Sequence, residues 1–247
     1  MSLELQMIGT GNAFAKRYFN NNALVSANGY RLLIDCGVTG PYALHQLGVS
    51  LTDIDGILIT HIHGDHIGGL EEVAFRMKFV HRSKLTLFVP DTLEKTLWES
   101  SLKGALEDPS AASDSLDCYF DVRPLREGVP VDLPGGLRVE LFPTRHIPGK
   151  PSYAVLLNEN VFYSSDMTFD PDLLVRLVDG GRCRHILHEC QLTGPGHVHT
   201  TLQELLTLPE PMQEKIWLMH YSDDRDSYIG KTGRMRFIEQ HQLYTFA

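Results

Sequence analysis

The sequence of residues 59–70 is Ile59-Thr60-His61-Ile62-His63-Gly64-Asp65-His66-Ile67-Gly68-Gly69-Leu70. It places three imidazoles and one carboxylate within six consecutive positions, directly after the apolar run at residues 56–59. Burying four such groups without a partner would leave polar atoms unpaired, at a high cost in free energy. We therefore interpret this stretch as part of a metal site. A polar loop with chance histidines is the alternative.

The local pattern places these residues between a strand and a helix. Residues 56–59 have the branched, apolar character of a buried strand, and Gly68-Gly69 followed by residues 70–75 is typical of a turn that enters a helix. On an extended backbone alternate side chains share a side, so His61 and His63 can hold one ion. Asp65 and His66 follow where the chain turns and face a different point, which indicates two neighbouring ions. Imidazole nitrogen and carboxylate oxygen together suit Zn²⁺, with Mn²⁺ or Fe²⁺ as weaker candidates.

The composition limits the class of protein. A chain of 247 residues that is 43% hydrophobic and 21% charged is long enough for one large core, and we expect a single domain over residues 1–247. The 31 acidic and 22 basic residues give a formal charge of −9, which argues against binding duplex DNA or long RNA. A small anionic substrate remains possible, because two divalent cations would reverse the local field.

Cysteine usage and the absence of apolar spans in the sequence favour a cytoplasmic protein. Residues 1–8 alternate like a strand and lack a cationic start followed by an apolar core, so we expect neither a signal peptide nor a membrane span. Scattered cysteines without close paired spacing favour free thiols over disulfides. These cysteines are Cys36, Cys118, Cys183 and Cys190.

Predicted strands dominate both halves of the chain, with helices interspersed, and this pattern favours an α/β fold in which two packed sheets are covered by helices. The small, polar and acidic segment at residues 104–115 is interpreted as a loop. Four further residues that could bind a metal or transfer a proton lie where apolar strands are expected to end: His146, Asp166, Glu189 and His220. Each alone is more often structural, but their shared placement favours a site on the edge of a sheet. Asp35 also ends a predicted strand and is as suited to orienting metal-site loops as to ligation.

The series His61-x-His63-x-Asp65-His66, followed by His146, Asp166 and His220, resembles the ligand series of the metallo-β-lactamase fold, and more narrowly the RNase Z-like phosphodiesterases. The resemblance implies a four-layer αββα sandwich with two metal ions at one edge. It implies that His61, His63 and His146 hold the first ion, that Asp65, His66 and His220 hold the second, and that Asp166 bridges them. Asp65 is also expected to take part in catalysis.

The same resemblance implies a proton donor formed by a glutamate and a histidine. Glu189 and His199-Thr200-Thr201 fit this pattern. His197 competes for the role, and we favour His199 because the two threonines follow it directly.

The expected substrate depends on a departure from the tRNA-processing enzymes. Those of the bacterial type carry a long arm between the positions that match His146 and Asp166, which here are only 20 positions apart. The cysteine cluster of the cyclic-ribose phosphodiesterases of phosphonate metabolism is absent as well. The sequence is most similar in character to the anti-Pycsar proteins, phage enzymes with relatives in the Bacillus and Paenibacillus group that degrade cyclic nucleotide monophosphates.

This closer resemblance implies hydrolysis of 3′,5′-cyclic AMP, GMP, CMP and UMP to nucleoside monophosphates. The nucleophile would be a hydroxide activated by two Zn²⁺ per subunit, or by Mn²⁺. Such hydrolysis would counter antiphage signalling by cyclic nucleotides. It also implies a homodimer. The sequence itself favours contact with neither membrane nor long nucleic acid, and Tyr119-Phe120, beside the acidic segment at residues 104–115, is our candidate to stack on a base in the partner's site. The rival functions are an RNA-processing endonuclease, another hydrolase of the fold such as a lactonase, and a cyclic-nucleotide sponge that binds without cutting.

Overall fold

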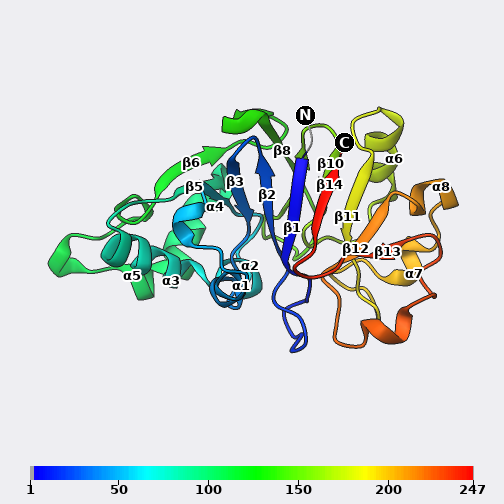
Figure 1. Ribbon diagram of the computed structural model, residues 1–247, viewed down its shortest axis with the longest axis horizontal. Coiled ribbons are helices and arrows are strands. Elements are labelled where there is room, and N and C mark those ends of the chain that lie inside the picture. Colours follow the sequence, from blue (N-terminus) through cyan, green and yellow to red (C-terminus); the bar gives the residue numbers. More distant parts are fainter. Residues whose placement is uncertain (1–2, 247) are drawn as a thin grey trace.

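The computed structural model describes residues 3–246, and within them the strands form two seven-stranded sheets (Figure 1). The first sheet has the order β14-β1-β2-β3-β4-β5-β6, and the second has the order β13-β12-β11-β10-β9-β8-β7. The strands of the first sheet are β1 (Leu3–Gly9), β2 (Asn22–Ala27), β3 (Tyr30–Ile34), β4 (Gly56–Leu58), β5 (Thr86–Pro90), β6 (Asp121–Leu125) and β14 (Leu243–Phe246). The strands of the second are β7 (Val131–Leu133), β8 (Leu137–Pro143), β9 (Tyr153–Leu157), β10 (Val161–Tyr163), β11 (His185–Glu189), β12 (Ile216–Met219) and β13 (Arg236–Phe237).

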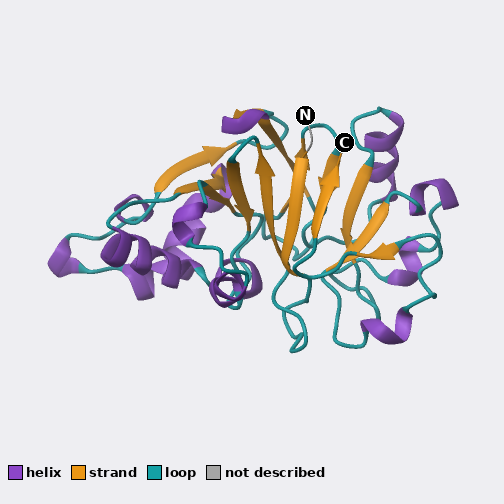
Figure 2. Ribbon diagram, in the orientation of Figure 1, coloured by secondary structure: helices purple, strands orange, loops and turns teal. Residues whose placement is uncertain are grey.

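The helices lie to either side of the strands (Figure 2). Those beside the first sheet are α1 (Gly40–Gln46), α2 (Gly64–Ile67), α3 (Leu70–Phe75), α4 (Asp91–Leu97) and α5 (Lys103–Leu106). Those beside the second sheet are α6 (Pro171–Asp179), α7 (Leu202–Leu205) and α8 (Glu210–Gln213).

Strand β9 shows how the layers are built. Side chains alternate between the faces of a strand. Val155 and Leu157 accordingly join the large core that contains the buried residues of the first sheet, whereas Ala154 and Leu156 join a second core with the leucines of α6 and α7. The two sheets therefore enclose one core between them, and helices cover their outer faces, as the predicted four-layer αββα sandwich requires.

Helix α6 illustrates how the sequence forms the outer layer. The Asp170 carboxylate accepts a hydrogen bond from the Leu173 backbone N–H at 3.0 Å, and Pro171 occupies the first turn, where a missing N–H is harmless. Leu173, Leu174 and Leu177 then fall on one buried face. Each buried leucine contributes roughly 1.5–3 kcal/mol relative to an exposed one, so packing on the sheet holds the helix in place.

The parallel strands bring distant segments together at one edge. Strands β3, β4, β5 and β6 run parallel, and so do β10, β11, β12 and β13. Carboxyl ends of parallel strands meet at the same edge of a sheet. The loops that follow β3, β4, β10, β11 and β12 are therefore neighbours, although they are far apart in sequence.

Two expectations need correction. The segment at residues 104–115 is not a loop throughout, because α5 reaches Leu106 and a single helical turn covers Pro109–Ala111. The Tyr119 ring is only 1% exposed, its hydroxyl donates to the Leu106 carbonyl, and the Lys78 ammonium lies 4.2 Å from its centroid. The proposed stacking of Tyr119 on a base in another subunit is therefore wrong, since the ring is used inside its own chain.

Candidate active site

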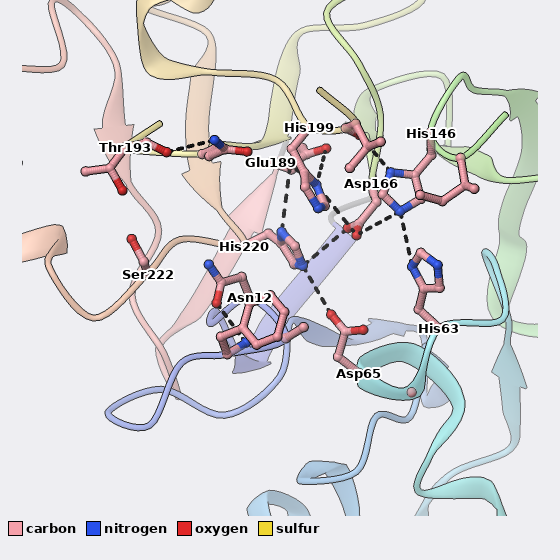
Figure 3. Close-up of a pocket in the computed structure, with 16 residues that line it drawn as sticks. Asn12, His63, Asp65, His146, Asp166, Glu189, Thr193, His199, His220 and Ser222 are labelled. Carbon is pink, nitrogen blue, oxygen red and sulfur yellow. Dashed lines mark hydrogen bonds and ion pairs between the residues drawn. The ribbon is translucent and has the colours of Figure 1, made fainter. Parts of the chain in front are cut away.

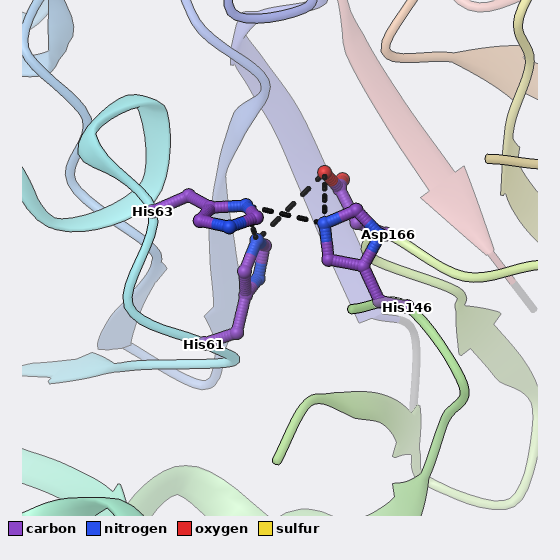
Figure 4. Close-up of side chains that lie close together, drawn as sticks. All are labelled: His61, His63, His146 and Asp166. Atoms are coloured by element: carbon purple, nitrogen blue, oxygen red, sulfur yellow. Dashed lines mark hydrogen bonds and ion pairs between the residues drawn. The ribbon is translucent and has the colours of Figure 1, made fainter. Parts of the chain in front are cut away.

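The first cluster of candidate ligands joins both sheets at the shared edge (Figure 4). His61 and His63 come from the loop after β4, His146 follows β8, and Asp166 follows β10. One ligand atom from each of these residues lies within 4.8 Å of the others. His63 Nδ1 is 3.1 Å from both His61 Nε2 and His146 Nε2, so three imidazole nitrogens converge on one point.

The second cluster lies beside the first. Asp65 and His66 belong to α2, and they meet His220, which follows β12, together with Asp166. Asp65 Oδ2 is 3.3 Å from both His66 Nε2 and His220 Nε2. The fold thus brings together the two groups of side chains that the family resemblance implies.

Asp166 connects the two clusters through its separate oxygens. Oδ2 is 3.7 Å from both His61 Nε2 and His146 Nε2. Oδ1 is 3.4 Å from His66 Nε2 and 3.5 Å from His220 Nε2. A carboxylate placed in this way presents one oxygen to each cluster, which is the geometry that a bridging ligand requires.

The spacing and the polar inventory fit two divalent cations. Four ligands placed tetrahedrally at 2.0–2.1 Å from Zn²⁺ lie about 3.4 Å from one another, and the contacts above range from 3.1 to 3.7 Å. His66 Nε2 and Asp166 Oδ1 are buried atoms without a hydrogen-bond partner among residues 3–246. Buried polar atoms are seldom left unpaired, so these two atoms are suited to cation ligation.

Three of the candidate imidazoles are oriented by a contact on their second nitrogen. Asp35 Oδ2 is 2.7 Å from His66 Nδ1, the Val198 carbonyl is 2.7 Å from His146 Nδ1, and Thr60 Oγ1 is 3.1 Å from His61 Nδ1. Such contacts fix the tautomer in which the other nitrogen is free to bind a metal. Of the two roles that the sequence left open for Asp35, the contact with His66 Nδ1 favours orientation over ligation.

The protonation of the free protein differs between the clusters. Burial, with the neighbouring imidazoles, lowers the pKa of His61, His63 and His146, so these side chains are neutral and ready to bind a cation. Burial opposes a charge on His220 as well, but Asp166 and Asp65 outweigh it and raise its pKa to about 10. The pKa of Asp166 is held well below its usual range, despite its burial, by His220 and His66.

Glu189 and His199 form a pair beside the clusters (Figure 3). His199 Nδ1 is 2.9 Å and 3.1 Å from the two Glu189 carboxylate oxygens, and 3.8 Å from Asp166 Oδ2. Burial lowers the pKa of His199, but the Glu189 carboxylate more than offsets this, and the pKa is raised overall. His197 is exposed instead, so the geometry favours His199 over its rival.

Members of both clusters and the Glu189–His199 pair border one cavity of about 600 Å³, whereas His61 and His66 are buried behind its wall. Figure 3 shows His63, Asp65, His146, Asp166, Glu189, His199 and His220 around it. The wall is completed by residues that the sequence did not single out for this site, including Phe14, Gln191, Thr193 and Ser222. The volume falls within the usual range for small-molecule sites.

Sequence reasoning also missed the supporting contacts around the ligands. The Thr60 and Ser165 hydroxyls are 2.7 Å apart, and Thr60 donates its backbone N–H to Asp35 Oδ1 at 2.8 Å. Thr60 and Ser165 each directly precede a candidate ligand in the sequence. A hydroxyl residue at that position could have been predicted to support the ligand. The Val198 contact uses a backbone carbonyl, which no side-chain pattern can reveal.

The fold and the paired clusters define a protein of the metallo-β-lactamase fold with two adjoining candidate metal positions. The structure resembles a metallo-β-lactamase fold protein, YhfI from Bacillus subtilis, with a TM-score of 0.77, 15% sequence identity, and coverage of 99% of this chain and 100% of the other. Residues 3–244 match the family described as Anti-Pycsar protein Apyc1. The chain belongs to this family.

Close relatives cover the full length of the chain. An anti-Pycsar protein Apyc1 of Paenibacillus xerothermodurans is 56% identical over 246 residues, which is 100% of this chain and 98% of the relative. That of Paenibacillus sp. (strain J14) is 57% identical over 245 residues, which is 99% of this chain and 100% of the relative. In residues 3–246 of the structure, every helix is too short or too polar to cross a membrane.

Proposed function

We propose that this protein is a two-metal phosphodiesterase that opens 3′,5′-cyclic nucleotide monophosphates to nucleoside monophosphates, and that it thereby counters Pycsar signalling. One observation carries the proposal: the two ligand clusters joined by Asp166 and the Glu189–His199 pair border a single cavity of about 600 Å³. Membership of the anti-Pycsar family supports the same reading.

The metal clusters are suited to an anionic phosphodiester. His61, His63, His146 and Asp166 would hold one cation, and Asp65, His66, His220 and Asp166 the other. Bound there, two divalent cations supply positive charge for the phosphate and lower the pKa of water. The Asp166 carboxylate would contribute to both positions, and the contacts of Asp35 with His66 Nδ1 and of the Val198 carbonyl with His146 Nδ1 would favour the tautomers that leave Nε2 free.

His199 is the proposed general acid. Opening a cyclic phosphodiester expels a ribose oxygen, which is a poor leaving group unless it receives a proton. The Glu189 carboxylate orients His199 through Nδ1 and favours its protonated form, which leaves Nε2 to donate a proton. General acid catalysis of this kind contributes roughly 10²–10⁴-fold in rate. A protein that only sequestered nucleotides would have no use for such a donor.

The segment between His146 and Asp166, together with the charge of the chain, argues against a tRNA substrate. The 20 positions from His146 to Asp166 form a loop and the antiparallel pair β9 and β10, so no projecting arm is present within this described segment. The formal charge of −9 would also repel a long polyanion. These features support a small substrate that enters the cavity whole.

Phe14 is the proposed contact for the base. Its side chain is 86% exposed although it borders the cavity. The loop that carries it is anchored, since Asn12 Oδ1 accepts from the Phe14 and Ala15 backbone N–H groups and Asp223 accepts from those of Lys16 and Arg17. An aromatic ring held in this way can stack on any base without hydrogen-bond readout.

The decisive experiment incubates protein loaded with Zn²⁺ or Mn²⁺ with cyclic AMP, GMP, CMP and UMP, a cyclic dinucleotide and a pre-tRNA, and separates the products by chromatography. We expect ring opening of the monophosphates, and its loss in Asp166→Ala. Asp172→Ala, which removes a carboxylate from the first turn of α6, is the matched control and should retain activity. Cleavage of the pre-tRNA alone, or tight binding without any product, would overturn the proposal.

We further propose that the protein works as a cytoplasmic homodimer with two Zn²⁺ per subunit. Light scattering of the purified protein measures the number of subunits, and elemental analysis measures the number of bound ions per subunit. Both measurements are independent of activity. A monomer, or one bound ion per chain at full activity, would contradict the respective part.

A further inference from the structure

A second concave site lies away from the candidate active site. A cavity of about 630 Å³ is bordered by the cations Arg184, Lys215, Arg234 and Arg236, with Trp217 and the single acidic residue Glu214. We call it the basic pocket. In a chain whose formal charge is −9, four cations around one hollow are an unusual local excess.

The topology places the basic pocket at the edge of the second sheet opposite the metal clusters. Arg184 precedes β11, Lys215 precedes β12, and Arg236 begins β13, so the cations gather at the amino ends of these parallel strands. Figure 1 shows α8 beside the start of β12 on this side. Glu189 and His220 stand at the carboxyl ends of β11 and β12 instead.

Three of the four cations have no acidic partner. The side chains of Arg184, Lys215 and Arg236 form no ion pair among residues 3–246. Arg234 is paired, since its guanidinium lies 3.1 Å from Glu210 Oε2. The pocket thus retains unneutralised positive charge that a ligand could use. The half-buried His185 reports the same field, because burial and then Lys215, Arg184 and Arg236 lower its pKa.

Arg236 is already held in position. Its guanidinium donates to the Glu214 carbonyl at 3.1 Å and lies 4.4 Å from the centroid of the Trp217 ring. Tyr244 packs edge-on against the same indole, with centroids 5.1 Å apart. Because the guanidinium and Tyr244 already pack against the indole, the site offers charge and N–H donors rather than a free stacking platform. Its chemistry suits phosphate oxygens.

We propose that the basic pocket binds a phosphate-bearing anion, independently of the metal clusters. Arg184 and Lys215 supply the uncompensated charge, and Arg236 supplies preorganised donors. The volume accommodates a nucleotide as well as inorganic phosphate or pyrophosphate, and these sources share the group that the cations recognise. The inference does not rest on the proposed phosphodiesterase function.

Trp217 provides a direct readout. The chain has two tryptophans, so Trp98→Phe leaves Trp217 as the only one. Titration of this metal-loaded protein with inorganic phosphate, pyrophosphate and a nucleoside 5′-monophosphate should produce a saturable change in emission, because a bound anion shifts the cation above the indole. Sodium chloride at equal ionic strength controls for screening. The relative affinities of the three ligands identify the source.

Variants separate this site from the metal clusters. We expect Arg184→Ala and Lys215→Ala each to raise the dissociation constant about tenfold, as loss of one charge-assisted contact does. Neither change removes an ion pair, so folding, followed by circular dichroism, should be retained. Arg176→Ala, an exposed arginine of α6, is the matched control and should leave binding unchanged. Absence of a saturable signal, or equal affinity in all variants, would overturn the proposal.

Discussion

Replacing Asp35 with asparagine should weaken metal binding while the backbone is kept. Asp35 is fully buried, and its oxygens face three groups: the Thr60 N–H at 2.8 Å, the Thr60 hydroxyl at 2.8 Å and His66 Nδ1 at 2.7 Å. Its φ is +61°, a conformation that asparagine tolerates well. The substitution therefore changes hydrogen-bonding capacity and charge with little change in shape.

The expected loss of metal affinity and stability in Asp35→Asn follows from the hydrogen-bonding groups that the new amide would leave unsatisfied. If its oxygen still accepts from the Thr60 N–H, its NH₂ group faces His66 Nδ1, which must then accept. The imidazole proton moves to Nε2, the atom that faces the second cluster. If the amide is turned the other way, the Thr60 N–H loses its acceptor at a cost of about 1–3 kcal/mol. Loss of such an orienting contact typically lowers metal affinity or activity about 10–100-fold.

Three measurements test this reasoning on purified Asp35→Asn protein. Elemental analysis after dialysis against a weak chelator should show loss of about one ion, and turnover of a cyclic nucleotide should fall about 10–100-fold. Urea unfolding of the metal-free protein should show a loss of about 1–3 kcal/mol at most. Glu140→Gln changes a buried carboxylate of β8 that pairs with Arg182 and belongs to neither cluster, and it should lower stability without loss of metal. If Asp35→Asn kept both ions and full activity, the orienting role would be refuted.

Three further changes probe other parts of the site. Glu189→Gln should lower turnover of cyclic nucleotides roughly a hundredfold. Because Glu189 raises the pKa of His199, loss of the Glu189 charge should move the alkaline limb of the pH–rate profile to lower pH. Hydrolysis of a phosphodiester with a good leaving group should be slowed much less. An equal loss of rate on both substrates would contradict the role of His199 as general acid. Gly37→Ala should lower the free energy of unfolding by about 1–3 kcal/mol and reduce metal content, because the new Cβ would lie 1.9 Å from the Asp65 carbonyl oxygen. Gly64→Ala is the control, since its Cβ would meet nothing within 4 Å. Equal stability of the two variants would count against the close approach at Gly37. Phe14→Ala should raise KM about tenfold with kcat unchanged, as loss of one base stack does. Phe79→Ala is the control, because it removes a ring that is 63% exposed, and it should leave KM unchanged. An unchanged KM in Phe14→Ala would exclude the stacking role.

The candidate ligands could be predicted because their local spacing already contains the geometry. His61 and His63 share a side of an extended segment, and Asp65 and His66 follow on the first turn of a helix. The distant partners His146, Asp166 and His220 each follow a strand. Strands β10 and β12 belong to the parallel set, and β8 runs in the same direction because β9 is antiparallel to both β8 and β10, so all three positions lie at one edge. What the sequence could not supply was the pairing of these segments across two sheets, which depends on contacts over the whole chain.

The failures have equally specific causes. Tyr119 was expected to stack on a base because it lies beside the acidic segment at residues 104–115, but α5 and Lys78 cover the ring. Phe14 went unnoticed because a single aromatic residue in a loop carries no periodicity. Strand β14 pairs with β1 from the other end of the chain, and no local pattern encodes that pairing.

The site and the sandwich depend on each other. Asp35, Ser165 and His220 have φ values of +61°, +50° and +55°, and each follows a strand that ends at the metal edge. Left-handed backbone at non-glycine residues costs of order 1–3 kcal/mol each and persists where the surroundings enforce it. Here the enforcing contacts are the hydrogen bonds of Thr60 with Asp35 and Ser165, and those contacts also orient the ligands. Each proposed cation would moreover be held by residues from both sheets, so binding would stabilise the same packing that creates the site.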